Sequence, residues 1–226
     1  MTDCFIIGGE AKVQCAIYGP SAGSPDLRDY SDEGIFVCDF KYAPFALAER
    51  RPAGQSDDER DLSAAITEAI KPSILLEKYP KSAINAFIMV LQNSGGVLAA
   101  AISCVSMALA HAGVECRDLV AACSAARLGE HIALDPSAHE EEREDAGTTV
   151  SYMACQNLVT SVIQRGDMPG SSCIDCIDFC IGGCGELRRV MRRCLLEKFV
   201  ADHASENPNE DWKTMLEKSF ESAKSS

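Results

Sequence analysis

The sequence is poor in positive charge, in aromatic side chains and in histidine. Its 21 lysines and arginines face 34 acidic residues, so the net charge is −13 at pH 7, and aromatic residues make up only 6% of the chain. Proteins that bind nucleic-acid phosphates through their net charge carry a basic surface. The composition excludes this mode for the chain as a whole and leaves room for a local basic patch. It favours a protein that sits beside basic partners or is simply soluble.

A leader and a membrane span are also missing from the sequence pattern. The opening residues, Met1-Thr2-Asp3-Cys4, lack the basic region of a signal peptide, and only a short apolar run follows them. The longest apolar run, Val97–Ala112, is too short to cross a bilayer as a helix. We therefore expect neither secretion nor contact with a membrane.

Cysteine, by contrast, is abundant, with 12 residues in 226. Most of them lie inside apolar runs, so we interpret them as reduced thiols that act as small apolar side chains. Cys173, Cys176, Cys180 and Cys184 are spaced by three and four residues, which places all four on one face of a helix and favours a buried helix face. The alternative is a zinc or iron–sulfur site, for which the helix would have to unwind. We expect no metal and no cofactor.

The chain is organised around the stretch 80–142. In order, this stretch contains a β-rich apolar run at 83–91, a turn at Gly95-Gly96, an alanine-rich helix at 97–112, a third apolar run at 119–128 and an acidic block at 140–142. The helix is apolar on all sides, which predicts a place inside the core. Strand, turn, helix and strand together predict a crossover unit with a candidate site at its ends.

The flanking segments predict further strands and helices. They are a hairpin formed by 4–7 and 12–18, a strand at 34–42, a helix that Ser56 caps, a hairpin formed by 148–154 and 158–164, a long helix at 173–203 and a last short helix from Asn207. Pro72 either kinks the helix that follows Ser56 or starts a second segment. Apolar residues on both faces of the 34–42 strand predict a central position in its sheet. The order of these elements gives an α+β fold class.

The candidate site has two halves of opposite chemistry. Gly95-Gly96 ahead of a helix could hold a phosphate at the helix N-terminus. Val97 and Leu98 follow with neither charge nor hydroxyl, which favours a plain strand–helix turn. The acids around Glu141 could hold Mg²⁺ or act as acid and base, although a solvated charge run is the commoner case. The four histidines show no metal-ligand spacing.

An ordered set of motifs from about Asp3 to His203 resembles the RNase PH family. The matching segments are Gly9-x-x-Lys12-Val13-x-Cys15-Ala16-x-Tyr18-Gly19-Pro20, Cys38-Asp39-Phe40-x-x-Ala43-Pro44-Phe45, Tyr79-Pro80-Lys81, Val90-Leu91-Gln92-x-x-Gly95-Gly96, Ala108-Leu109-Ala110-x-Ala112-Gly113-Val114, Asp118-Leu119-Val120 and Leu134-Asp135-Pro136 with Glu140-Glu141. Each motif alone is weak, but the ordered set is specific. The resemblance implies an RNase PH-like fold (ribosomal protein S5 domain 2-like), with mixed sheets packed with helices, over 1–204, and a helical extension or tail at 205–226.

The resemblance also bears on catalysis. Active members of the family are phosphorolytic exoribonucleases that carry an arginine after the Gly-Gly turn and two aspartates, six residues apart, that hold metal and assist the attack. Counted along this chain, the arginine position falls at Val97-Leu98, the first acid at Glu141 and the second at Gly147. Phosphorolysis brings an anionic nucleophile to an anionic backbone, so the loss of the phosphate-binding cation and of one of the two acids implies a catalytically silent subunit.

The family's silent members are subunits of the eukaryotic RNA exosome ring, and this chain is most similar to the mRNA-transport-regulator type, with related types left open. The resemblance implies a six-membered ring with other RNase PH-like subunits, S1/KH cap subunits, single-stranded RNA in the channel, a part in rRNA processing and mRNA decay, and a place in the nucleus, nucleolus and cytoplasm. We predict RNA contacts from Arg50, Arg51 and Lys81. The alternative is an active phosphate-dependent 3′–5′ exoribonuclease with displaced site residues.

Overall fold

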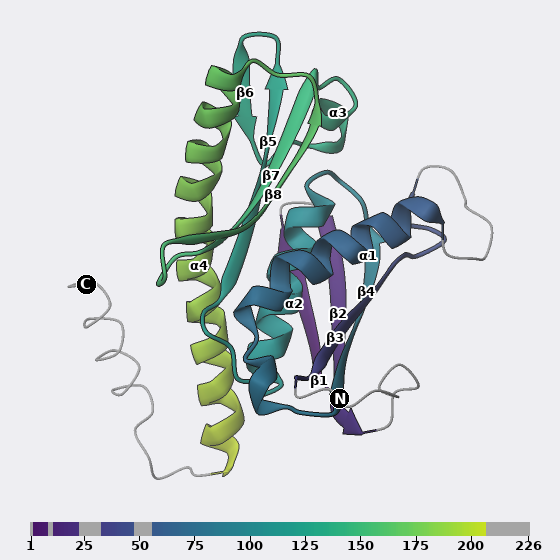
Figure 1. The fold of residues 1–226 in the computed structure, drawn as a ribbon, viewed down its shortest axis with the longest axis vertical. Coiled ribbons are helices and arrows are strands. Elements are labelled where there is room, and N and C mark those ends of the chain that lie inside the picture. Colours follow the sequence, from purple (N-terminus) through teal and green to yellow (C-terminus); the bar gives the residue numbers. More distant parts are fainter. Residues whose placement is uncertain (1, 9–10, 23–32, 48–55, 207–226) are drawn as a thin grey trace. The chain divides into compact units, whose positions relative to one another are not determined.

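The structure is a computed structural model, which describes residues 2–8, 11–22, 33–47 and 56–206. The chain forms two compact units, 1–188 and 189–226, and all of the described strands belong to the first (Figure 1). Of the second unit, only the end of helix α4 (Gly170–Glu206) is described. The predicted short helix from Asn207, and nearly all of the tail predicted at 205–226, lie outside the described residues.

The first sheet contains the N-terminal hairpin that the sequence predicts. Strands β1 (Thr2–Gly8), β2 (Ala11–Ala22), β4 (Ser82–Gln92) and β3 (Ile35–Tyr42) lie in the order β1-β2-β4-β3. Strands β3 and β4 are parallel and are joined through helix α1 (Asp57–Ile70), so the crossover unit of this sheet is β3-α1-β4.

The central position predicted for the 34–42 strand is wrong, because β3 is at the edge of its sheet. Helix α1 packs on β3, and its side chains satisfy backbone groups of the strand. The Phe40 N–H donates to Ser63 Oγ at 3.0 Å, and the Tyr42 N–H donates to Glu59 Oε1 at 3.0 Å. Only one face of the strand is buried, with Phe36, Cys38 and Phe40 in the core, whereas Val37 on the other face is 42% exposed. Ser56 caps α1 through a capping box with Glu59, as predicted.

Two short 3₁₀ helices, η1 (Lys71–Ser73) and η2 (Leu76–Lys78), connect α1 to β4. Pro72 lies in η1, where the α-helix has ended, so the break predicted at this proline is confirmed.

The second sheet is antiparallel, with strands β5 (Val120–Leu128), β6 (His131–Leu134), β7 (Ala146–Met153) and β8 (Leu158–Gly166) in the order β6-β5-β7-β8. The crossover unit predicted over 83–128 is therefore wrong: its two strands, β4 and β5, belong to different sheets. The sequence pattern identified the elements but could not show which strand pairs with which, since pairing is a long-range property.

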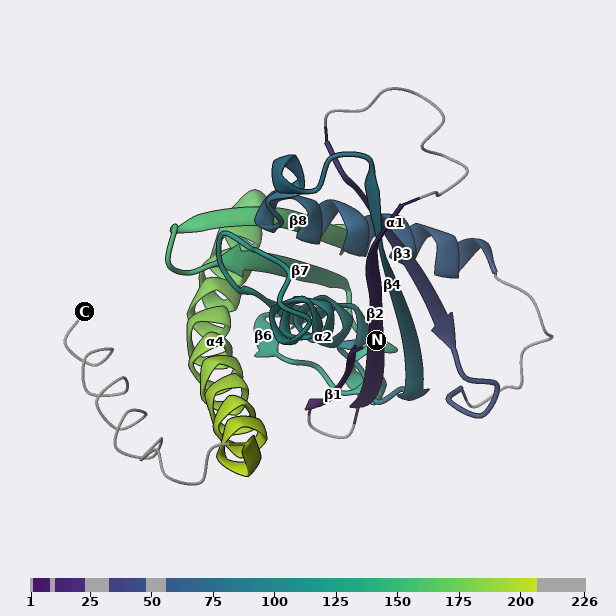
Figure 2. The ribbon, with the colours of Figure 1, turned by 90° about the horizontal axis from the view of Figure 1, so that it is seen from below.

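Helix α2 (Val97–His111) lies between the two sheets, as its all-round apolar surface predicts. It packs on β1 and β2 of the first sheet and on β5 and β7 of the second, and Figure 2 shows it end-on between them. Two of its polar residues serve the second sheet. Ser103 Oγ accepts a hydrogen bond from the Ala122 N–H at 3.1 Å, and Ser106 Oγ accepts one from the Val120 N–H at 2.9 Å. These bonds satisfy backbone N–H groups of β5 in the part of the strand that does not pair with β6.

The N-terminal half of α4 covers the second sheet with its cysteine face. Cys176, Cys180 and Cys184 are fully buried, and Cys176 and Cys180 pack with Val150 and Met168 in a small separate core. The buried helix face predicted from their spacing is confirmed for these three residues. Within the described part of the chain, no helix is long and apolar enough to span a membrane.

Candidate functional site

The Gly95-Gly96 turn joins β4 to α2 in a conformation that favours glycine. Gly95 has φ +101°, and Gly96, the N-cap of α2, has φ +59°. A Cβ on Gly95 would lie 2.3 Å from the Pro136 carbonyl oxygen, and one on Gly96 would lie 2.9 Å from Asp135 Oδ1. The turn is therefore pressed against the segment that follows β6, and a side chain at either position would collide with it.

The acidic block meets this turn directly. Ser137 begins helix α3 (Ala138–Glu141) with a capping box to Glu140, and Glu141 Oε1 accepts a hydrogen bond from the Gly96 N–H at 2.8 Å. The Ala138 N–H donates to the Ser94 carbonyl at 2.8 Å, which ties the two segments together. A carboxylate at the N-terminus of α2 is favoured by the helix dipole. The predicted proximity of the Gly-Gly turn and the acids is confirmed.

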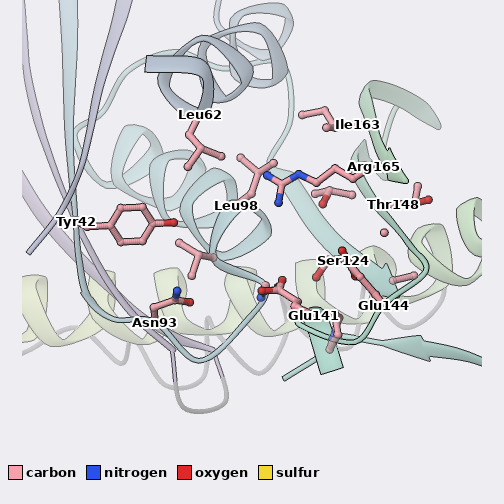
Figure 3. Close-up of a pocket in the computed structure, with 16 residues that line it drawn as sticks. Tyr42, Leu62, Asn93, Leu98, Ser124, Glu141, Glu144, Thr148, Ile163 and Arg165 are labelled. Atoms are coloured by element: carbon pink, nitrogen blue, oxygen red, sulfur yellow. Dashed lines mark hydrogen bonds between the residues drawn. The ribbon is translucent and has the colours of Figure 1, made fainter. Parts of the chain in front are cut away.

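A small cavity of about 80 Å³ lies at this junction, with roughly the room of two or three water molecules (Figure 3). The residues that line it come from both sheets and both of the helices between 57 and 111. They include Tyr42, Leu62, Asn93, Gly96, Val97, Leu98, Ser124, Glu141, Glu144, Gly147, Thr148, Ile163 and Arg165. All four positions that the sequence singled out as degenerate, Val97, Leu98, Glu141 and Gly147, therefore meet in one pocket.

The first turn of α2 presents apolar side chains to this pocket. Val97 and Leu98 are each 7% exposed and belong to the main core, so their side chains pack rather than bind. A phosphate at this helix end would find backbone N–H groups but no cation from the helix itself.

Glu144, which the sequence analysis did not assign a separate role, fills the space beside Gly147. A Cβ built on Gly147 would lie 2.7 Å and 2.8 Å from the two carboxylate oxygens of Glu144. A carboxylate therefore stands next to the position where the resemblance expects the second acid, although a different residue supplies it. Burial and the nearby charge of Glu141 raise the pKa of the Glu144 carboxyl, and Arg165 opposes this effect.

Three further polar residues of the pocket were missed by sequence reasoning. Arg165 lies on β8 directly across the ladder from Gly147, and its side chain extends toward Leu98 (Figure 3). Ser124 on β5 and Thr148 on β7 are 7% and 1% exposed, and the hydroxyl oxygen of each has no hydrogen-bond partner within the structure. No local motif marks these residues, because only the strand pairing brings them to the turn.

The pocket does not fit the divalent cation that the resemblance associates with active members. Glu141 and Glu144 are its only carboxylates, one oxygen of Glu141 is engaged by the Gly96 N–H, and the Arg165 guanidinium shares the cavity. Among the described residues, no group of three or more histidine, cysteine, aspartate or glutamate side chains could hold a metal ion. The same finding covers the described cysteines of α4, which were the alternative metal ligands.

Lys81, the one predicted RNA contact among the described residues, does not line this pocket. Lys81, with φ +55°, precedes β4, whereas Asn93 and the Gly-Gly turn follow its far end. The 11 residues of β4 separate the two places by roughly 35 Å of strand. Arg50 and Arg51 lie outside the described residues. The RNA-binding role of all three stays a prediction.

The chain matches both domains of the 3′ exoribonuclease (RNase PH) family, domain 1 over residues 4–115 and domain 2 over residues 118–182. These matches, with the fold and the Gly-Gly turn that faces an acidic block, place it among the RNase PH-like proteins. The chain belongs to this family.

Relatives from archaea support the assignment. The chain is 33% identical over 195 residues to the exosome complex component Rrp41 of Cenarchaeum symbiosum, covering 86% of this chain and 80% of that protein. It is 34% identical over 194 residues to Rrp41 of Methanopyrus kandleri, covering 86% and 81%.

Solved structures show the same fold at lower identity. Rice Rrp46 superposes with a TM-score of 0.75 at 19% identity, covering 85% of this chain and 87% of that one. A chain of the Archaeoglobus fulgidus exosome with RNA bound to the active site gives a TM-score of 0.72 at 18% identity, covering 83% and 82%. The RNase PH-like α+β fold predicted from the sequence is confirmed.

Proposed function

We propose that this chain is a non-catalytic RNase PH-like subunit of the RNA exosome ring. Its family membership and the names of its relatives, which are exosome components, support the ring assignment. The observation that carries the silent role is the start of α2, where Val97 and Leu98 are packed into the core at the place where the resemblance expects a phosphate-binding arginine.

The charge of the pocket supports the same conclusion. Of the residues that line the described pocket, Glu141 and Glu144 carry negative charge and Arg165 carries the one positive charge. A phosphate nucleophile would bring further negative charge toward an RNA phosphodiester that is itself anionic. Without a surplus of cations, neither ground-state binding nor the transition state is stabilised.

The role that remains is architectural. The chain pairs with other RNase PH-like subunits in a six-membered ring, beneath S1/KH cap subunits, and single-stranded RNA passes through the channel. Less acidic partners offset its net charge of −13, and Arg50, Arg51 and Lys81 supply local positive charge toward the RNA. The subunit thereby supports rRNA processing and mRNA decay in the nucleus, the nucleolus and the cytoplasm. Its subunit type in this proposal is the mRNA-transport-regulator type.

Affinity purification tests the ring assignment. The tagged full chain is isolated at moderate salt from its own cells, and co-eluting proteins are identified by mass spectrometry. We expect other RNase PH-like chains and S1/KH proteins in near-equal amounts. Recovery of the tagged chain without any RNase PH-like partner would overturn the proposal. A Lys81→Glu variant should still assemble but should crosslink less to RNA, since Lys81 is exposed and the substitution reverses its charge.

A second candidate, an active phosphate-dependent 3′–5′ exoribonuclease, is favoured by one observation. The Glu144 carboxylate lies 2.7 Å from the Cβ position of Gly147 and could replace the missing acid. The two candidates differ in one product, nucleoside diphosphate, which only the active enzyme releases from RNA in the presence of phosphate.

A further inference from the structure

Helix α4 carries a row of four cysteines, here called the cysteine seam, which consists of Cys173, Cys176, Cys180 and Cys184. A fifth cysteine, on the second sheet, lies against this row. Cys123 lies on β5, and its sulfur would be 3.1 Å from a Cβ built on Gly183, the residue that precedes Cys184. A side chain at Gly183 would therefore push β5 and α4 apart. Because Gly183 has no side chain, the Cys123 sulfur can lie against the helix at the level of Cys184.

Independent contacts place the Cys184 sulfur at the same point. Cys184 Sγ lies 3.7 Å from the Val150 carbonyl oxygen, and Val150 is the residue directly opposite Cys123 in the β5–β7 ladder. Cys180, one turn earlier, makes the equivalent contact with the Thr148 carbonyl at 3.9 Å. The helix register thus sets Cys184, and not Cys180, across from Cys123, and the two thiols are hydrogen-bonded to each other.

The two thiols are chemically unequal. The hydrogen bond from Cys184 lowers the pKa of Cys123, against the effects of burial and of Asp135. The same hydrogen bond, together with burial, raises the pKa of Cys184, and burial raises the pKa of Cys180 to about 12. Cys123 is also partly exposed, whereas Cys180 and Cys184 are fully buried. A partly exposed thiol with a lowered pKa beside a buried thiol with a raised one has the arrangement of an attacking and a resolving cysteine.

We propose that Cys123 and Cys184 form a reversible dithiol–disulfide site that is oxidised by peroxides. The Cys123 thiolate attacks one peroxide oxygen, so that an S–O bond forms, the O–O bond breaks and hydroxide leaves. The sulfur of Cys184 then attacks the Cys123 sulfur, so that an S–S bond forms and the S–O bond breaks, and the released hydroxide takes the Cys184 proton as water. The two thiols are oxidised by two electrons and the peroxide is reduced.

The product is a covalent staple between β5 and α4. It fixes the helix to the second sheet at a position where the reduced protein relies on a small core. This site is separate from the pocket at the Gly-Gly turn, so it is independent of the proposed ring function.

Peptide mapping of the native full-length chain tests the proposal. The protein is treated with increasing hydrogen peroxide, alkylated, digested and analysed by mass spectrometry. We expect a peptide linked through Cys123 and Cys184 that disappears after treatment with dithiothreitol. The exposed Cys155 serves as an internal measure of the oxidant dose. If Cys123 and Cys184 are still alkylated as free thiols when Cys155 is oxidised, the proposal fails.

Two variants assign the roles of the thiols. In Cys184→Ser, Cys123 should accumulate as a sulfenic acid that dimedone traps, with no linked peptide. In Cys180→Ser, a matched change in the same seam, the link between Cys123 and Cys184 should form as in the unmodified chain. A link from Cys123 to Cys180 in the unmodified chain would overturn the assignment. Because the mapping of the unmodified chain decides the outcome, a variant that fails to fold leaves the test intact.

Discussion

Gly95 illustrates how a single residue is fixed by backbone geometry. Its φ of +101° and the 2.3 Å approach to the Pro136 carbonyl oxygen leave no room for a side chain. Gly113 has a positive φ of +75° but no atom within 4 Å of its Cβ position. Backbone strain and steric collision therefore act together at Gly95, whereas strain acts alone at Gly113.

Gly95→Ala should lower the free energy of unfolding by about 2 kcal/mol or more, since backbone strain and collision add. Gly113→Ala, the matched control, should lower it by about 1 kcal/mol. Urea denaturation followed by circular dichroism measures both. Equal effects of the two substitutions would show that the contact with Pro136 is not close in solution.

The raised pKa of Glu144 should make the stability of the folded protein depend on pH. Its folded-state pKa is raised, so the folded protein binds this proton more tightly than the unfolded chain, and the ionised carboxylate is disfavoured as pH rises through the raised value. Glu144→Gln should therefore increase stability at pH 7, and the difference from the unmodified chain should shrink as pH falls from the raised pKa toward the ordinary glutamate pKa, below which both the folded and the unfolded chain hold the proton. Thermal unfolding between pH 4 and pH 7, roughly the window of interest, measures this. A difference that stays constant with pH would contradict the assigned environment, in which Glu141 and Arg165 face the carboxyl.

At the scale of elements, helix α2 both packs in the core and accepts hydrogen bonds from a strand of the second sheet. Ser106 accepts the Val120 N–H at 2.9 Å in a buried position, so the helix completes the hydrogen bonding of a strand. Ser106→Ala should cost about 1–3 kcal/mol of stability, because a buried donor loses its partner. Ser82→Ala, where an exposed hydroxyl contacts a carbonyl two residues away, should change stability by less than about 0.5 kcal/mol. Chemical denaturation compares them; a similar effect of both would argue against this role of Ser106.

Most elements could be predicted from the sequence because their signals are local. The capping box at Ser56, the two hairpins, the apolar helix 97–111 and the cysteine face of α4 each depend on residues close in the chain. The edge position of β3 and the separation of β4 and β5 into two sheets could not be predicted, because both depend on which strands pair. Helix α3, four residues long, was too short to be distinguished from an acidic loop.

The pairing of β7 with β8 explains why Arg165 was missed. Met153 faces Leu158 at the turn between the two strands. An irregularity between Ser151 and Tyr152 shifts the register by one residue, so that Gly147, further from the turn, faces Arg165. Without this shift, simple counting from the turn would place Gln164 there. A one-residue change in register also changes which side chains share a face.

At the scale of the whole molecule, the chain has the RNase PH-like fold, and the pocket at its Gly-Gly turn joins segments from both sheets. The sequence predicted that the Gly-Gly turn and the acids around Glu141 would meet, and they do. That Val97, Leu98 and Gly147 are degenerate catalytic positions stays a prediction. It did not predict that the Glu144 side chain would lie against Gly147, three residues further on, or that the pairing of β5 with β7 would bring the unpartnered hydroxyls of Ser124 and Thr148 into the pocket. The pocket therefore contains polar side chains, but helix α2 contributes no cationic side chain to it.

Putting back the missing cation and the missing acid should restore activity to the pocket. Leu98→Arg would supply the missing cation, and Gly147→Asp would supply the second acid. Because an aspartate at 147 would collide with the Glu144 carboxylate, Glu144→Gly must accompany it. The triple variant, in its assembled complex, should gain phosphate-dependent RNA degradation, measured against the variant with Leu98→Arg alone. A soluble, assembled triple variant that stays inactive would show that the pocket lacks more than these groups.

The most direct measurement of the central claim is phosphorolysis by the unmodified chain. The purified chain, alone and in its complex, is incubated with 3′-tailed RNA, phosphate and Mg²⁺, and nucleoside diphosphates are quantified. Glu141→Gln is assayed beside it, so that any activity of co-purified subunits appears equally in both. We predict no difference between the unmodified chain and this variant. Release of nucleoside diphosphate that requires phosphate and is lost in Glu141→Gln would contradict the proposed non-catalytic role.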